Sequence, residues 1–323
     1  MLRRSSTSRS RSVSADGSRR GWTRHKRHRR AHPALYLFPL PALAVYLVFF
    51  AYPTLQSFQY AITDWNGYSA TYRNVGLSNL TTLATGDDLF RNAAENNVKL
   101  MFAVVIGQSL FALALALFLA KTTRASTLLR ALFFLPTIMS SVAVAFIWQF
   151  VYDPDTGLVD SALRGIGLGA LQQAFLGSPS AAIYWLAVVQ IWFHAGQMMV
   201  VFIAGLQAIP REFYEAAELD GAGAFQRFRY VTWPLIAPAT AIVTAYTTVQ
   251  SFKAFDLVLG LGGNPPNSSL DLLSTRIYTT FSNYQYGYAA AESLIFMALI
   301  ALVTIVQRRA LRLLGSRTGE ASS

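Results

Sequence analysis

The 323-residue sequence contains no cysteine, and this absence removes several kinds of site. Without thiol groups the chain has no disulfide framework, no thiolate nucleophile and none of the usual cysteine-based zinc or iron–sulfur sites. It also lacks the GxxxxGK[ST] pattern that cradles nucleotide phosphates, the HExxH zinc motif, and any Ser/His/Asp cluster or paired carboxylates near its apolar segments. We therefore expect no catalytic residue, no metal site and no cofactor bound by this chain.

Charge is also scarce. Charged residues make up 13% of the sequence, whereas hydrophobic residues make up 53% and aromatic residues 13%. The mean hydropathy is +0.36, and this composition is typical of a chain that folds in a lipid bilayer. The formal net charge is +11, but the basic residues gather at the ends of apolar stretches, so a nucleic-acid partner is not expected.

The first segment, 1–32, is rich in Arg and Ser and has almost nothing apolar to bury. Such a composition predicts a disordered cytoplasmic tail. The apolar stretch that follows is long enough to span a bilayer and ends in bulky residues, so we interpret it as an uncleaved first span rather than a signal peptide.

Long apolar windows predict an all-α, polytopic membrane protein with six transmembrane helices. We place the membrane domain at 33–314 and a short cytoplasmic C-terminal tail at 315–323. The predicted spans are 33–52, 98–120, 128–151, 181–206, 235–261 and 289–307.

The distribution of basic residues predicts the orientation. If the N-terminus is cytoplasmic, the inner connections and the C-terminal segment are rich in Lys and Arg, whereas the outer ones carry only Arg73, Arg91, Arg164 and Arg276. Because Lys and Arg accumulate on the cytoplasmic side, both termini are expected to lie there, in a multi-pass protein of the cell membrane.

One cytoplasmic connection, 209–239, is patterned beyond the needs of a linker. Pro210 can open a helix, Glu215 then lies near the favourable positive end of its dipole, and Gly221 is a natural stop, so we predict a helix over about 210–220. Ala216 and Ala217 leave part of this helix without bulk, which suits close approach by a partner. From physics alone, an ordinary solvated amphipathic connector is an equally good interpretation.

The residues of this connection make the sequence resemble a known family, the permeases of binding-protein-dependent ABC importers, whose EAA loop has the same pattern. The matching residues are Glu215, Ala216, Ala217, Asp220, Gly221, Ala222, Pro234 and Pro238. The resemblance extends over about 33–314 and is closest to the maltose-type and glycerol-phosphate-type sugar permeases. It departs from the family at Asp160, where Asn is frequent, and at Asn264, where Pro is usual.

The resemblance implies a division of labour between subunits. The EAA loop, between helices 4 and 5, would couple this chain to a dimer of separate ATPase subunits, which bind and hydrolyse ATP with Mg. The other implied partners are a second permease subunit and an extracytoplasmic solute-binding protein that delivers a sugar-like substrate. The alternative that we weigh is an ion-coupled secondary transporter with no ATPase partner, although no inverted repeat is visible.

Polar side chains within the spans are candidates for the solute path, because such groups are costly in lipid unless they face a cavity or a partner. Gln190, His194 and Gln197 share one helical face. Amides, imidazole and aromatic rings suit sugar recognition. The predicted path residues are Gln190, Trp192, His194, Gln197, Gln250 and Phe252. Hydrogen bonding between neighbouring helices is the alternative role for these groups.

Lys253 and Asp256 lie three residues apart in the fifth predicted span. Residues at this spacing meet on a helix surface, so we interpret them as a structural ion pair rather than as groups that bind the solute.

Overall fold

The computed structural model describes residues 37–169 and 175–319, with side chains described up to residue 310. The chain divides into two compact units, Met1–Ala51 and Tyr52–Ser323. In the first unit the described residues form the helix α2 (Leu40–Tyr46) and a π-helical turn, Leu47–Ala51. Almost every side chain there is exposed, and the Tyr46 and Phe50 rings stack with their centroids 4.9 Å apart.

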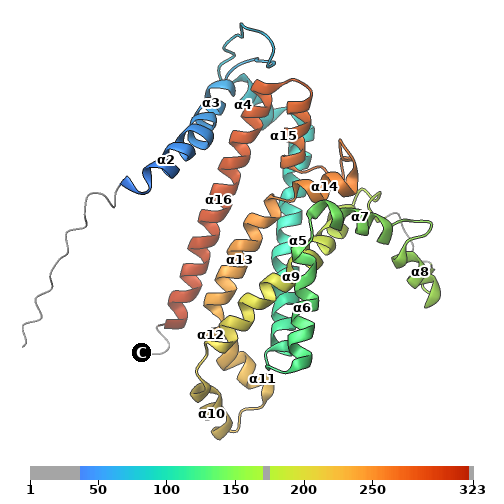
Figure 1. Ribbon diagram of the computed structural model, residues 1–323, viewed down its shortest axis with the longest axis vertical. Helices are drawn as coiled ribbons and strands as arrows, with labels where there is room; N and C mark the ends of the chain where they lie inside the picture. The colour runs from blue at the N-terminus through green and yellow to red at the C-terminus, as the bar shows by residue number, and fades with distance from the viewer. Residues whose placement is uncertain (1–36, 170–174, 320–323) are drawn as a thin grey trace, which may run out of the picture. The chain divides into compact units, whose positions relative to one another are not determined.

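The second unit is helical throughout its described secondary structure apart from one isolated bridge (Figure 1). Its first half contains α3 (Tyr52–Tyr60), α4 (Ser78–Thr85), α5 (Asp88–Leu119), α6 (Arg124–Ile138), α7 (Ser141–Val151) and α8 (Leu158–Gly165). Its second half contains α9 (Ala182–Gln207), α10 (Arg211–Leu219), α11 (Ala224–Arg227), α12 (Trp233–Leu235), α13 (Ala237–Phe252), α14 (Phe255–Gly262), α15 (Leu273–Ser282) and α16 (Tyr286–Gly319). A π-helical turn, Phe228–Thr232, joins α11 to α12.

The long helices α5 and α9 pack along one another and form the centre of this unit. Small residues allow the close approach: a Cβ on Gly107 of α5 would lie 2.5 Å from Ile191 Cδ1 of α9. Both helices contribute to two of the buried apolar clusters, one towards α7 and α14 and the other towards α13. A third cluster joins α4, α5, α15 and α16.

Among the described residues, four helical segments are long and apolar enough to cross a membrane: Leu40–Tyr60, Asp88–Leu119, Ala182–Gln207 and Tyr286–Ala310. The third predicted span, 128–151, is a bent pair, because α6 and α7 meet at 102° and give a fifth span only if the pair is counted as one. The fifth predicted span, 235–261, is divided among α12, α13 and α14, the longest of which has 16 residues. The all-α polytopic fold is therefore confirmed with four or five spans.

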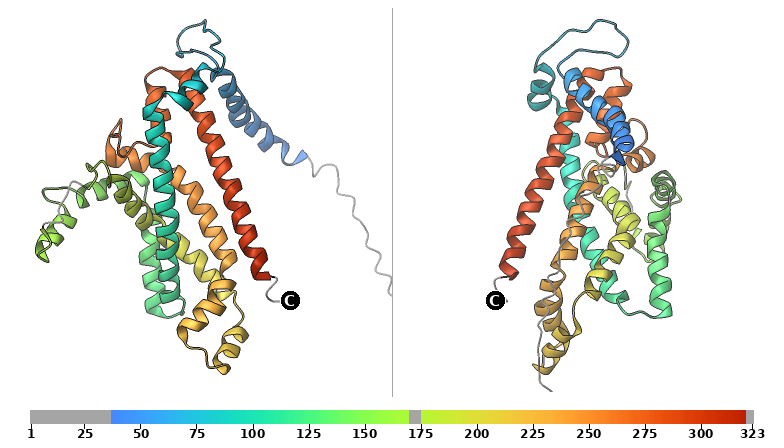
Figure 2. Two further views of the ribbon diagram at one scale, coloured as in Figure 1. Left: turned by 180° about the vertical axis from the view of Figure 1, so that it is seen from behind. Right: turned by 60° about the vertical axis from the view of Figure 1, so that its left-hand side comes forward.

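The short helices α10 and α11 lie at the end of the unit opposite α15 and α4, as both views in Figure 2 show. The connection between α3 and α4, residues 61–77, lies at the α15 end (Figure 1). It has its own ordered structure. An antiparallel bridge pairs Thr63 with Asn74, and the side-chain amide of Asn79 donates to the carbonyls of Ala61 and Thr63, both at 2.9 Å.

Asp64 gives this connection a predictable pH dependence. Its carboxylate accepts hydrogen bonds from the backbone N–H and the Nε of Arg73, at 2.8 and 2.9 Å, and these bonds, led by the backbone one, hold the pKa of Asp64 below its ordinary value. A carboxyl whose pKa falls on folding stabilises the folded form above its unfolded pKa, and the contribution is lost as the pH falls through the lower, folded pKa.

We therefore expect the backbone amides of 61–77 to lose protection from hydrogen exchange as the pH falls below the ordinary range of aspartate. The measurement is exchange at several pH values, corrected for the intrinsic rate. The Asp64→Asn variant is the control, and it should show low protection that does not change with pH. Equal pH dependence in both proteins would contradict this role of Asp64.

Candidate functional site

A cavity of about 290 Å³ lies where two interrupted helix pairs face α9. One interruption is the bend between α6 and α7, at Met139 and Ser140. The other is the break between α13 and α14, at Lys253 and Ala254. Irregular backbone at membrane depth is tolerated where it lines a cavity, and transporters build solute sites at such interruptions.

Polar and charged groups converge on this cavity from four elements. Its lining residues are Met139, Ser141, Gln190, Phe193, His194, Gln250, Lys253, Ala254, Asp256 and Leu257. Within this set, Ser141 Oγ donates to Asp256 Oδ2 at 3.3 Å, which links α7 to α14. His194 Nδ1 lies 3.3 Å from the carbonyl oxygen of Gln190. The remaining donors and acceptors can bind a ligand with several hydroxyl groups.

Three of the six predicted path residues line the cavity: Gln190, His194 and Gln250. Gln250 also accepts from the buried Gln108 on α5, with 3.5 Å between Nε2 and Oε1.

The other three predicted path residues lie elsewhere. Trp192 packs edge-on against Trp148, with 5.6 Å between ring centroids. Gln197 donates to the hydroxyl of Tyr246 at 3.2 Å. Phe252 is buried and packs against Phe296. The helical face predicted from the sequence therefore brings Gln190 and His194 to the cavity, whereas Gln197 and Trp192 do not line it.

The expected ion pair between Lys253 and Asp256 is not among the ion pairs of the described residues. The prediction assumed one continuous helix, whereas Lys253 is the C-cap of α13 and Asp256 lies in the first turn of α14. The break changes the direction of the chain between them. Both side chains line the cavity instead, and sequence reasoning missed this placement because apolar windows do not register helix breaks.

The patterned connection 209–239 forms two helical segments at the far end of the unit (Figure 2). Pro210 caps α10, Asp220 follows its last turn, and Gly221 has φ +77°, a left-handed conformation that glycine adopts without steric cost. The predicted helix, 210–220, agrees with α10 to within one residue at each end. The second segment begins at Ala224 and continues through the π-helical turn into α12.

Internal contacts fix the shape of this connection and leave one face open. Glu218 pairs with Arg227 across the turn, and the hydroxyl of Tyr214 lies 3.1 Å from Thr232 Oγ1. The side chain of Glu215 is exposed, and none of the hydrogen bonds or ion pairs of the described residues engages it. The loop therefore holds Glu215 on an ordered helix, where a partner can reach it.

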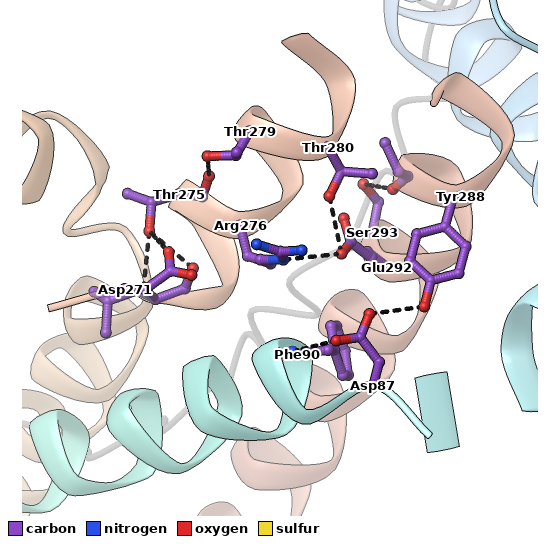
Figure 3. A network of polar contacts seen from close by, with 12 residues as sticks. Asp87, Phe90, Asp271, Thr275, Arg276, Thr279, Thr280, Tyr288, Glu292 and Ser293 are labelled. Carbon is purple, nitrogen blue, oxygen red and sulfur yellow. Dashed lines mark hydrogen bonds and ion pairs between the residues drawn. The ribbon is translucent and has the colours of Figure 1, made fainter. Parts of the chain in front are cut away.

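A second polar cluster, none of whose residues line the cavity, ties α15 to α16 and to the start of α5 (Figure 3). Glu292 on α16 is fully buried, accepts from Thr280 Oγ1 at 3.1 Å and lies 3.8 Å from Arg276 Nε. The hydroxyl of Tyr288 donates to Asp87 Oδ2 at 2.8 Å, while Asp87 Oδ1 caps α5 by accepting from Phe90 N. The contacts of Glu292, Tyr288 and Asp87 are structural, because they join neighbouring helices to one another.

A family model and related sequences both show that this chain is similar to the permeases of ABC transporters. Residues 108–315 match the family described as the binding-protein-dependent transport system inner membrane component. A probable ABC transporter permease protein of Pyrococcus horikoshii is 32% identical over 274 residues, which are 84% of this chain and 94% of the relative. The multiple sugar-binding transport system permease protein MsmF of Streptococcus mutans is 32% identical over 273 residues, 84% of this chain and 93% of the relative.

Among solved structures, a chain of a bacterial ABC transporter involved in the import of the acidic polysaccharide alginate has the same fold. The TM-score is 0.75, at 23% sequence identity, and the match covers 86% of this chain and 95% of that chain.

Proposed function

This chain belongs to the inner-membrane permease family of binding-protein-dependent ABC importers, and from that premise we propose that it forms the path for a sugar or sugar derivative. It is a transport component without a catalytic role. Family membership decides between the two functions considered from the sequence, in favour of the importer and against the ion-coupled secondary transporter. It also implies a separate ATPase partner.

The cavity is the observation that best supports the proposed class of solute. Gln190, His194 and Gln250 offer amide and imidazole groups to it, and Lys253 and Asp256 add one charge of each sign. This set donates and accepts hydrogen bonds without a net charge, which suits a polyhydroxylated solute better than a simple ion. The relative from Streptococcus mutans is named for the transport of multiple sugars, which supports the same solute class.

The proposed topology has six spans, with α12, α13 and α14 together making the fifth. The connection 209–239 contains Arg211, Arg227 and Arg229, and the last part of α16 contains Arg308, Arg309, Arg312 and Arg317. This distribution supports a cytoplasmic location for both termini. In this arrangement 1–32 and 315–323 are cytoplasmic tails, and 33–314 is the transmembrane domain. The tail 1–32 lies outside the residues that the structure describes.

The connection 209–239 is proposed as the coupling loop, with Glu215, Gly221 and their neighbours in the EAA pattern as the contact with the ATPase. An exposed carboxylate on an ordered helix supports this role. The full assembly is proposed to contain this chain, a second permease subunit, two ATPase subunits that use ATP with Mg, and an extracytoplasmic binding protein. Closure of the ATPase pair would then move the loop, and the resulting rearrangement of the helices would change the side of the membrane to which the cavity opens.

The test combines the ligand of the cognate binding protein with variants of the cavity. We expect a thermal-shift screen of the binding protein to select a carbohydrate. In the reconstituted complex, Gln190→Leu should lower uptake of that carbohydrate about tenfold, because its buried amide loses hydrogen bonds worth about 1–2 kcal/mol to the solute. Gln59→Leu, at an exposed position of α3, is the matched control and should transport normally. Selection of a solute that is not a carbohydrate, or normal uptake by Gln190→Leu, would refute the proposal.

A further inference from the structure

Two adjoining hollows lie on the connection 61–77, beside the start of α16 and outside the transport cavity. The first, of about 360 Å³, is lined by Asp64, Trp65, Asn66, Ser69, Thr71, Tyr72 and Arg73. The second, of about 430 Å³, is lined by Thr63, Asp64, Trp65, Asn66, Asn79, Tyr284, Gln285 and Tyr288. They share Asp64, Trp65 and Asn66, so together they form one continuous surface with two compartments.

The walls of these hollows are fixed in place before any ligand arrives. Asn66 Oδ1 accepts from the backbone N–H groups of Tyr68 and Ser69, at 3.1 and 3.0 Å. Trp65 Nε1 donates to the carbonyl of Ser69 at 3.2 Å, and the Trp65 carbonyl accepts from Gly287 N at 2.9 Å. A site that is already ordered loses little conformational entropy when it binds.

Aromatic rings stand on both sides of the shared wall. Trp65 is supported from behind by Tyr60, with stacked rings 4.5 Å apart. Tyr72 lies on one side of it, with 6.1 Å between ring centroids, and is 43% exposed. Tyr284 lines the second hollow, is 53% exposed and packs against Tyr68, with 5.0 Å between ring centroids. Tyr60 covers one face of Trp65, whereas Tyr72 and Tyr284 are partly exposed, so aromatic surface remains available to a ligand.

Tyr284 is held in a conformation that its side chain disfavours. Its φ is +60°, and it is the only non-glycine residue with a positive φ in the described part of the chain. Glycine or asparagine would adopt this left-handed conformation at lower cost. A tyrosine kept there points to a use for its ring, since such strain tends to persist at functional positions.

Polar side chains that can bind hydroxyl groups lie beside the aromatic rings of the second hollow. The side-chain amide of Gln285 and the amide nitrogen of Asn66 make none of the hydrogen bonds found among the described residues, and both line the second hollow. Sugar rings present apolar C–H faces and a rim of hydroxyls, so they bind to aromatic faces flanked by planar amides and carboxylates. Each hollow is also within the usual volume range of small-ligand sites, roughly 300–1,000 Å³.

We propose that the two hollows around Trp65 form a carbohydrate-binding surface on the extracytoplasmic side, separate from the transport cavity. Two compartments with a shared aromatic wall fit successive units of an oligosaccharide better than a single sugar ring. The surface would hold solute near the mouth of the path as it is handed over. This proposal rests on the proposed orientation and solute class.

The experiment uses the assembled transporter in lipid nanodiscs, without binding protein, and maltotriose and N,N′-diacetylchitobiose as probes. Saturation-transfer NMR reports which sugar contacts the protein, and a titration gives its apparent affinity. We expect the wild type to bind at least one probe, and Tyr284→Asn and Tyr72→Ala each to weaken it about tenfold or more. Tyr284→Asn should at the same time raise the thermal unfolding midpoint by relieving strain, so a loss of binding cannot be attributed to misfolding.

Two control variants test whether the sugar binds at this surface rather than at another exposed tyrosine or in the transport cavity. Tyr184→Ala removes a tyrosine of similar exposure, 51%, from α9 and should leave binding unchanged. Gln190→Leu in the transport cavity should reduce uptake and keep the NMR signal, which distinguishes failure of this surface from failure of the proposed transport path. No signal from the wild type, or an equal signal from Tyr284→Asn and Tyr72→Ala, would overturn the proposal. Weaker capture of the binding protein by these variants with unchanged sugar binding would identify the surface as a protein contact and also overturn it.

Discussion

Replacing Glu215 with alanine is expected to abolish solute uptake while leaving the permease folded and in the membrane. Glu215 is exposed on α10 and makes none of the contacts that shape the connection, so its loss removes no internal support. A charged contact that is buried at an interface costs about 2–5 kcal/mol when one partner is truncated, because the other is left unpaired. That corresponds to a loss of affinity of about 30-fold or more.

The measurements are uptake into proteoliposomes, ATPase activity stimulated by the loaded binding protein, and copurification of the ATPase. Glu212→Ala is the matched control, since Glu212 is an exposed glutamate of the same helix, one turn earlier, outside the EAA pattern. We expect the control to transport normally and Glu215→Ala to lose ATPase stimulation. Normal stimulation in Glu215→Ala with a fully assembled complex would show that coupling does not pass through this side chain.

The connection 209–239 was predictable because local chemistry determines most of its structure. Proline favours the start of a helix, and glycine favours the left-handed residue that ends one. Both occur at the expected places, and α10 agrees with the predicted helix to within one residue at each end. The fourth span was predictable for a related reason. The window 181–206 is uniformly apolar, and α9 runs from Ala182 to Gln207.

The cavity was only partly predictable, because it depends on bends that hydropathy does not record. The window 128–151 is apolar across the turn at Met139, where the chain changes direction by 102°. The window 235–261 is equally continuous across Lys253 and Ala254. Neither bend interrupts the apolar window, so hydropathy does not place Ser141 and Lys253 at a cavity.

The hollows around Trp65 were missed for a different reason. Their rings come from two segments separated by more than 200 residues, and each tyrosine alone is typical of the membrane interface. Their convergence, and the positive φ of Tyr284, are visible only in three dimensions.

The close packing of α6 on α9 leads to the second large effect, because Gly196 leaves no room for a side chain. A Cβ at this position would lie 2.0 Å from the carbonyl oxygen of Phe133 and 2.7 Å from the Cα of Phe134. Both are backbone atoms of α6, so a rotamer change cannot relieve the clash. The same contact is held by Thr137 Oγ1, which donates to the carbonyl of Phe193 at 2.9 Å.

We therefore expect Gly196→Ala to destabilise the permease by about 3 kcal/mol, at the upper end of the usual cost of overpacking, although alanine is the better helix former. The measurements are the thermal unfolding midpoint in nanodiscs and the yield of monodisperse complex. Gly165→Ala is the control, since a Cβ there meets nothing within 4 Å, and its midpoint should be unchanged or slightly higher.

The Gly196→Ala substitution also tests whether the packing of α6 on α9 affects transport. Because Met139 and Ser141 follow directly from α6, a shift of α6 away from α9 would widen the cavity that these residues line with Gln190 and His194. Any Gly196→Ala protein that does assemble should therefore take up its solute with a higher KM. A stable variant with normal KM would mean that α6 can move without disturbing the cavity, and the bend between α6 and α7 would then have no part in the solute site.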